Sequence, residues 1–130
     1  MAQSEHRQLI ERFVACMNQH DVDGLAACYA RDAVIRYPGR APQSPDEYSS
    51  GERAMLESVP DYAIEPLSML EADDGHVILE LRMSGTQRAE LGGRSFSITG
   101  AYVFQIVEGL IVEERAYPDL AGLRSQLRPQ

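Results

Sequence analysis

Apolar residues in the first part of the chain recur at helical spacing. Over residues 4–18 they form one stripe, which consists of Leu9, Ile10, Phe13, Val14 and Met17. This spacing predicts an amphipathic helix, and Ser4 is placed to cap its start. Polar residues 18–21 end the pattern, and Asp21 then caps a short second helix. The buried face of this second helix is expected to carry Leu25, Cys28 and Tyr29.

The next segment contains a short strand and a third helix. Residues 33–37 form the strand, and Pro38–Gly39 stops it. The third helix carries apolar residues at 54–56 and ends near Ser58. Its start stays open, because Pro45 follows one capping-box serine and a second such pattern covers residues 49–52.

From Tyr62 onward the period changes to that of strands. Turn sequences rich in glycine and acidic residues divide this half into four strands, over residues 62–71, 77–83, 94–107 and 110–117. Residues 120–127 are expected to form a short helical turn or a frayed tail. Strands joined by short connections pair antiparallel, and helices gathered early in the chain indicate an α+β fold.

The strand over residues 94–107 has two distinct faces. One face carries Ala101, Val103 and Gln105, and the other carries Tyr102, Phe104 and Ile106. We expect the second, apolar set on the outer face of the sheet. An exposed apolar face of that size indicates a partner, so a homodimer through the outer sheet face is expected.

The composition fits one globular domain over residues 1–130. The formal net charge of −8 argues against nucleic acid and against a membrane surface as partners, since both require a basic surface. Cys16 and Cys28 lie in apolar helical surroundings and are expected as free thiols. The three histidines have no metal-ligand spacing. No signal-like start and no membrane-length apolar run is found, so a cytoplasmic location is expected.

Several short motifs resemble one known family in their order and spacing. They are Leu25–Val34, Pro60–Tyr62, Gly85–Thr86, Gly109–Glu113 and Tyr117–Leu120. Together they resemble the SnoaL-like branch of the nuclear transport factor two-like superfamily, the relatives of polyketide cyclases and ketosteroid isomerases. The resemblance implies a cone-shaped α+β fold, in which a curved, mostly antiparallel sheet and three N-terminal helices enclose an apolar pocket. It also implies a dimer through the outer sheet face.

The resemblance places a catalytic carboxylate at Asp119. In the cyclases of this branch an aspartate on the last strand is the general acid/base, and Asp119 matches its position. A carboxylate in a dry pocket has a raised pKa and can move protons near neutral pH. The alternative is that Asp119 caps a helical turn that begins at Leu120. Two histidines common in the family are replaced here by Gln105 and Gln87, which cannot titrate.

Gln105 is nevertheless the second catalytic candidate. Its amide could donate a hydrogen bond to a substrate carbonyl or to a developing oxyanion. The alternative is a structural hydrogen bond to Asp119 or Arg115. Val103 lies on the same strand face, which the resemblance directs toward the pocket, and is expected to contact substrate.

Three further residues are expected to bind substrate. Arg115 and Tyr117 share the alternation of Asp119, so they face the pocket if Asp119 does. A run of acidic and basic residues beginning at Glu113 is also typical of a solvated strand edge, which is the alternative for Arg115. Tyr37 could donate a hydrogen bond to a carbonyl, or serve only as an aromatic residue of the pocket rim.

These candidates predict a small enzyme that needs no cofactor. Its pocket aspartate would carry out acid/base chemistry, as in cyclisation or isomerisation, on a small apolar molecule that bears a carbonyl group. The alternative is a ligand-binding or dimerisation module of the same fold without chemistry, because both family histidines are replaced. Epoxide hydrolysis ranks last, since Glu80 and Arg82 lie on the face opposite the apolar residues of their strand.

Overall fold

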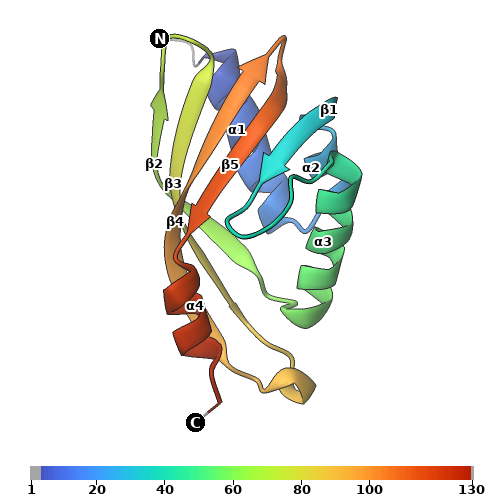
Figure 1. Cartoon of the computed structure of the whole chain (residues 1–130), viewed down its shortest axis with the longest axis vertical. Coiled ribbons are helices and arrows are strands. Elements are labelled where there is room, and N and C mark those ends of the chain that lie inside the picture. The colour runs from blue at the N-terminus through green and yellow to red at the C-terminus, as the bar shows by residue number, and fades with distance from the viewer. Residues whose placement is uncertain (1–3, 130) are drawn as a thin grey trace.

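The computed structural model describes residues 4–129 as one curved sheet with helices against its concave side (Figure 1). The strands are β1 (Tyr29–Arg36), β2 (Ala63–Glu71), β3 (His76–Thr86), β4 (Ser95–Val107) and β5 (Leu110–Pro118). The helices are α1 (Glu5–Asn18), α2 (Val22–Ala26), α3 (Pro45–Ser58), the short 3₁₀ helix Ala89–Leu91 and α4 (Leu120–Leu127). In the described part of the chain, no helix is long and apolar enough to cross a membrane.

The strands follow the order β1-β5-β4-β3-β2 across the sheet. All neighbours pair antiparallel except β1 and β5, which run parallel. The three antiparallel pairs are formed by strands that follow one another in sequence, as their short connections require. The predicted α+β class, with a curved and mostly antiparallel sheet and three helices before the main strands, is confirmed.

Side-chain caps set where the helices begin. Ser44 and Glu47 form a complete capping box, so α3 begins at Pro45 and not at Gly51. The segment after β5, expected as a turn or a tail, is a helix of eight residues. Strand β1 begins at Tyr29, four residues before the predicted start at residue 33.

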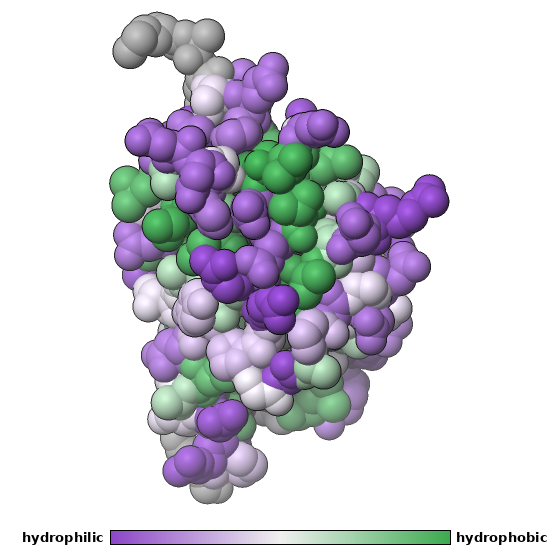
Figure 2. Space-filling model, turned by 45° about the horizontal axis from the view of Figure 1, so that its top comes forward, coloured by the Kyte–Doolittle hydropathy of each residue, from purple (hydrophilic) through white to green (hydrophobic). Residues whose placement is uncertain are grey.

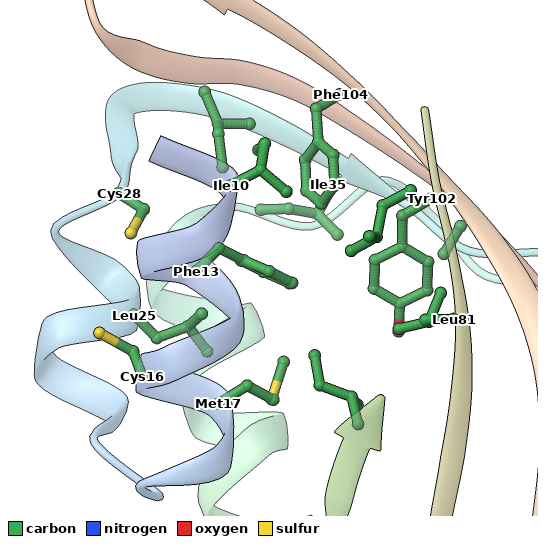
Figure 3. Close-up of a cluster of buried hydrophobic side chains, with 14 of the residues drawn as sticks. Ile10, Phe13, Cys16, Met17, Leu25, Cys28, Ile35, Leu81, Tyr102 and Phe104 are labelled. Atoms are coloured by element: carbon green, nitrogen blue, oxygen red, sulfur yellow. The ribbon is translucent and has the colours of Figure 1, made fainter. Parts of the chain in front are cut away.

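Packing of α1 against the sheet decides which sheet face is internal. The Phe13 ring lies edge-on to Phe104, at a centroid distance of 5.1 Å, and to Tyr102, at 6.3 Å (Figure 3). Ile106 is buried on the same face. The prediction that these three β4 residues form the outer face is therefore wrong. Alternation separates two faces of a strand, but it does not say which one the helices cover.

A β-bulge in β5 changes the orientation of the residues that follow it. Gln105 of β4 pairs with Glu113, yet the next residue, Ile106, pairs with Ile111, so Val112 is the extra residue. Ile111 and Glu114 consequently both point inward, although they are three positions apart. Glu114 is completely buried, in the same layer as the apolar core.

Candidate functional site

A cavity of about 700 Å³ lies between α3, the inner face of the sheet and α4. Its wall is mostly apolar and aromatic, with four tyrosines and one phenylalanine: Tyr37, Tyr48, Tyr62, Tyr102 and Phe96. Helix α4 is held against β4 by the Gln126 side chain, which accepts from the backbone N–H of Ser97 at 2.7 Å and donates to its carbonyl at 3.1 Å. The volume and lining are those of a small-molecule site.

Two tyrosine hydroxyls meet in the cavity wall. The hydroxyl oxygens of Tyr37 and Tyr102 are 3.3 Å apart, and Tyr37 also stacks on Tyr48 at a centroid distance of 6.4 Å. Burial raises the pKa of Tyr37 and of Tyr102 well above the ordinary value, so both phenols stay protonated. They are therefore hydrogen-bond donors at every physiological pH.

Glu52 supplies a carboxyl group to the same cavity. It lies on α3 one turn after Tyr48, and its Oε2 atom is buried without a hydrogen-bond partner among the described residues. Burial raises the pKa of Glu52 to about 7, and the nearby Tyr48 hydroxyl offsets part of that rise. A carboxyl group of this kind is half ionised near neutral pH and can act as acid or base.

A second buried carboxyl, Glu114, lies behind the cavity wall. The Tyr29 hydroxyl donates a hydrogen bond to its Oε1 atom, and Oε2 has no partner within residues 4–129. Burial raises the pKa of Glu114 to about 8, and the charge of Glu52 adds to the rise. The ring of Tyr29 contacts that of Tyr48 at a centroid distance of 5.7 Å, which connects Glu114 to the cavity. Glu114 is therefore mostly protonated at neutral pH.

Sequence reasoning missed both carboxyl groups. Glu52 was considered only as part of a capping box, and Glu114 only as part of a solvated strand edge. A helical signal was present for Glu52, because it follows Tyr48 by four residues and so shares its buried face. Glu114 carried no comparable signal, since the bulge at Val112 breaks the alternation that would have placed it inside.

The predicted site residues fall into three groups, at the cavity, at the cap of α4 and on the outer face of the sheet. Tyr37 lines the cavity, as does Gln87. Asp119 is exposed and caps α4, where its Oδ1 atom accepts from the backbone N–H of Gly122 at 2.9 Å. Asp119 does not line the cavity, although Pro118 and Leu120 on either side of it do. The capping interaction is thus present, and the catalytic role of Asp119 stays a prediction.

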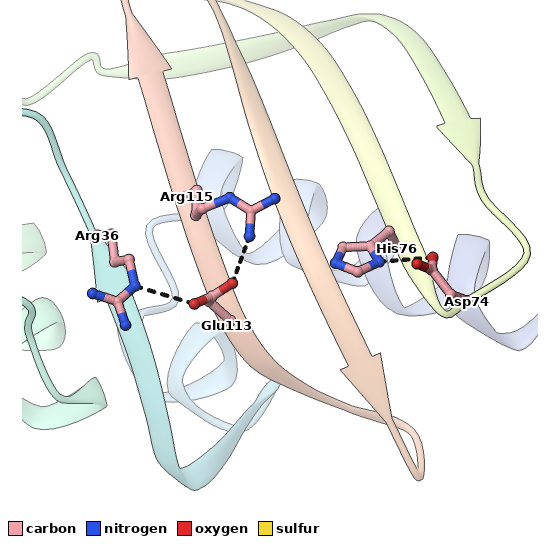
Figure 4. Close-up of polar contacts among 5 residues, drawn as sticks. All are labelled: Arg36, Asp74, His76, Glu113 and Arg115. Atoms are coloured by element: carbon pink, nitrogen blue, oxygen red, sulfur yellow. Dashed lines mark hydrogen bonds and ion pairs between the residues drawn. The ribbon is translucent and has the colours of Figure 1, made fainter.

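Gln105, Val103, Arg115 and Tyr117 lie on the outer face of the sheet, away from the cavity. The expectation that they face the pocket is wrong, because the residues of β4 and β5 that point inward are the ones that alternate with these four. Arg115 donates to Glu113 at 2.7 Å, and Figure 4 shows this pair on the side of the strands opposite the helices. Their roles in catalysis and binding stay predictions.

The outer face is held together by ion pairs. Arg36 of β1 donates to Glu113 of β5 at 3.1 Å, and Arg115 of β5 pairs with the same carboxylate (Figure 4). The Arg36–Glu113 pair links the two parallel strands. These arginines hold the pKa of Glu113 below its ordinary value. At the start of β3, His76 contacts Asp74 of the preceding turn at 2.7 Å. Among the described residues, no three histidine, cysteine or acidic side chains gather in a way that could hold a metal ion.

The capping role of Asp119 predicts a specific pattern of stability. Asp119→Ala removes the acceptor for the Gly122 N–H and should lower the free energy of unfolding by about 1 kcal/mol. Asp119→Asn keeps a capping oxygen and should cost only a few tenths of a kcal/mol. Urea denaturation of the two variants measures both values. Equal losses in the two variants would show that charge, and not the capping hydrogen bond, is what stabilises α4.

Glu114 predicts an unusual dependence of stability on pH. Its folded-state pKa of about 8 lies above the unfolded value of ~4.3, so the folded chain holds a proton that the unfolded chain releases. The contribution of this group to the free energy of unfolding is complete below the unfolded-state pKa and is lost as the pH rises toward 8. Between pH 5 and 8 the loss should be on the order of 3 kcal/mol.

Glu114→Gln should remove that share of the loss, because an amide does not titrate. Urea denaturation at pH 5 and pH 8 measures the difference, and Glu52 contributes a smaller fall in the same direction. Glu113→Gln is the matched control, since the neighbouring carboxylate is already ionised at both pH values and should leave the profile unchanged. A Glu114→Gln variant with the wild-type profile would contradict the buried, protonated state.

Comparison with known proteins identifies the family. The sequence profile of the SnoaL-like domain matches residues 10–114, and no curated protein sequence matches the chain. AclR from Streptomyces galilaeus, a proposed hydroxylase, is 21% identical with a TM-score of 0.85 over 99% of this chain and 89% of AclR. TsrD from Streptomyces laurentii is 25% identical with a TM-score of 0.81 over 98% and 97% of the two chains. IdmH from Streptomyces antibioticus, a proposed polyketide cyclase, is 21% identical with a TM-score of 0.82 over 95% and 99%. The chain belongs to the SnoaL-like domain family.

Proposed function

We propose that this protein is a small-molecule enzyme that uses a carboxyl group in its cavity for acid/base chemistry on an apolar, carbonyl-bearing substrate. The observation that carries the proposal is Glu52, a carboxyl group with a pKa of about 7 in an aromatic cavity of about 700 Å³. A pKa near the working pH is the condition for efficient proton transfer in both directions. The similarity to a proposed polyketide cyclase agrees with cyclisation or isomerisation as the reaction type.

The proposed chemistry begins with Glu52 in its ionised form. Its carboxylate takes a proton from the carbon next to the substrate carbonyl, and the hydroxyl of Tyr37 or Tyr102 donates a hydrogen bond to the oxygen that gains negative charge. In isomerisation, Glu52 returns the same proton at a second carbon. In cyclisation, the enolate carbon attacks a second carbonyl of the substrate, and the resulting alkoxide takes the proton from Glu52.

Asp119 is the alternative proton carrier. Its family position supports it, and both of its sequence neighbours line the cavity. Its own carboxylate is engaged in capping α4, which favours Glu52 for the role. Gln105 and Val103 take no part in these steps, because they lie on the other side of the sheet.

Hydrogen–deuterium exchange at the carbon next to the carbonyl of 2-tetralone tests the proposal without knowledge of the natural substrate. The wild-type protein should accelerate exchange in D₂O, and the rate should rise as the pH passes through about 7, since only ionised Glu52 accepts a proton. Glu52→Gln should lower the catalysed rate about 10²- to 10⁴-fold. NMR spectroscopy of the ketone measures the exchange.

Two variants serve as controls for this experiment. Glu57→Gln changes an exposed glutamate on the same helix and should leave the rate unchanged. Asp119→Asn keeps the cap and should also exchange at the wild-type rate. Loss of exchange in Asp119→Asn but not in Glu52→Gln would transfer the role to Asp119. A wild-type protein that binds the ketone without exchange would favour the ligand-binding module.

We also propose that the outer sheet face joins two copies of the chain, as the family resemblance implies. Val103 is half-buried on this face, and Tyr117, two residues beyond Arg115, is 53% exposed. Seen from a direction tilted from that of Figure 1, the surface carries hydrophobic patches between hydrophilic side chains (Figure 2). The cytoplasmic location expected from the sequence stays a prediction.

Analytical ultracentrifugation tests the dimer. The wild-type protein should sediment with twice the 14.5 kDa mass of one chain at tens of micromolar. Val103→Arg should shift it to the monomer, because an arginine side chain does not fit a packed sheet-to-sheet contact. Leu91→Arg, at an exposed position on the 3₁₀ helix, should stay dimeric. A wild-type monomer over this concentration range would contradict the proposal.

A further inference from the structure

Two arginines stand out among the residues that line the cavity. Arg40 lies in the loop after β1, and Arg124 lies on α4. Both are exposed, so they line the part of the cavity that reaches the surface. Neither side chain forms an ion pair or hydrogen bond within residues 4–129, whereas six other arginines pair with acidic side chains: Arg7, Arg36, Arg53, Arg82, Arg88 and Arg115.

Both arginines are carried by backbone that is held in place. The loop of Arg40 is closed by two backbone hydrogen bonds between Ile35 and Gln43, at 2.8 and 2.9 Å. Helix α4 is fixed by its Asp119 cap at one end and by the hydrogen bonds of Gln126 with β4 at the other. The backbone that carries each arginine is therefore held in place, on two different elements that both line the cavity.

The two arginines differ in charge from the protein as a whole, which is acidic. The chain carries a formal net charge of −8, and its 12 basic residues are all arginines. Glu52 is the sole acidic residue among those that line the cavity. Exposed acidic groups more than about 10 Å away are screened at ordinary salt, so the field at the opening is set by its own residues. The residues that line the cavity thus carry two cations and one carboxyl group, and Asp119 lies beside them between Pro118 and Leu120.

We propose that Arg40 and Arg124 bind a carboxylate of the substrate while its apolar body occupies the cavity. Arginine side chains bind carboxylates through charge-assisted hydrogen bonds, and these two have no internal carboxylate to satisfy them. This inference rests on the proposed function, since it assumes that the cavity takes a small-molecule substrate. It narrows the substrate class to an apolar molecule that carries a carboxylate in addition to the reacting carbonyl group.

The cavity wall adds to the description of that substrate. The rings of Tyr37 and Tyr48 stack with an interplanar angle of 27°, and Phe96 lies in the same wall. Flat ring systems pack well against such surfaces. The side chain of Gln87 also lines the cavity, although its Oε1 atom is buried away from it. The best-fitting ligand is therefore an aromatic molecule that bears both a carboxylate and the reacting carbonyl group.

A pair of probes of the same shape tests the inference. Isothermal titration calorimetry of 2-naphthoate and the neutral 2-naphthamide should show that the wild-type protein binds the acid about tenfold more tightly. Arg40→Gln and Arg124→Gln should each reduce this preference severalfold and leave the affinity for the amide unchanged. Added salt should reduce the preference as well. Arg128→Gln is the matched control, because it removes an exposed arginine that follows α4 without lining the cavity.

The outcomes separate this inference from the proposed function. Equal affinity for acid and amide would overturn the carboxylate site and leave the acid/base proposal intact. A loss of preference in Arg128→Gln equal to that in Arg124→Gln would show an effect of net charge alone and would also overturn it. A lower melting temperature with an unchanged preference would assign the arginines a structural role instead. Absence of binding by both probes, together with absence of 2-tetralone exchange, would contradict the proposed function itself.

Discussion

The edge-on packing of Phe13 against Phe104 and Tyr102 determines where this fold is filled and where it is open. Phe13 and Phe104 are completely buried, and they close one end of the curved sheet with apolar side chains. Tyr102 forms the boundary, since its ring contacts Phe13 on one side and its hydroxyl meets that of Tyr37 in the cavity wall. No described residue of α1 lines the cavity, which α3 and α4 enclose instead. The cavity is therefore a consequence of how far the core extends along the sheet.

The two buried carboxyl groups, Glu52 and Glu114, lie in the same dry environment but differ in pKa. Two like charges close together in a medium of low polarity cannot both be ionised without a large cost, so their titrations are linked. Glu114 has no contact with the cavity and holds its proton to about pH 8, whereas Glu52 lines the cavity and titrates near pH 7. The protein thus keeps one ionisable base available at neutral pH and avoids burying a second charge. The Tyr29 hydroxyl bonds Glu114, and the Tyr29 ring contacts the ring of Tyr48, which lies one helical turn before Glu52. The two carboxyl groups are thus connected through these tyrosines and not by a direct hydrogen bond.

Features that depend on local interactions were predicted correctly from the sequence. Predictions were wrong for features that depend on contacts between residues far apart in the chain. Caps at Ser4 and Asp21 predicted the starts of α1 and α2, whereas two possible capping boxes left the start of α3 open. The alternation of β3 correctly placed Val77, Leu79, Leu81 and Met83 on one buried face. The faces of β4 were also separated correctly, but their assignment to inside and outside was reversed. That assignment depends on where α1 packs, which no local pattern contains. The bulge at Val112 is likewise a property of the β4–β5 register, and it placed Glu114 inside against the pattern of its neighbours.

The position of Asp119 shows how a family likeness can carry a fold without carrying a site. The motif around it lies where the resemblance puts it, yet the side chain points to the backbone of α4, and an acidic group reaches the cavity from α3 instead. A carboxyl group can reach the cavity from a helix, because the cavity is bounded by helices as well as strands and any inward residue can supply one. What the chemistry requires is a desolvated acid beside hydrogen-bond donors, and not a given strand position. At about 21% identity, side chains can exchange roles while the backbone that surrounds the cavity stays the same.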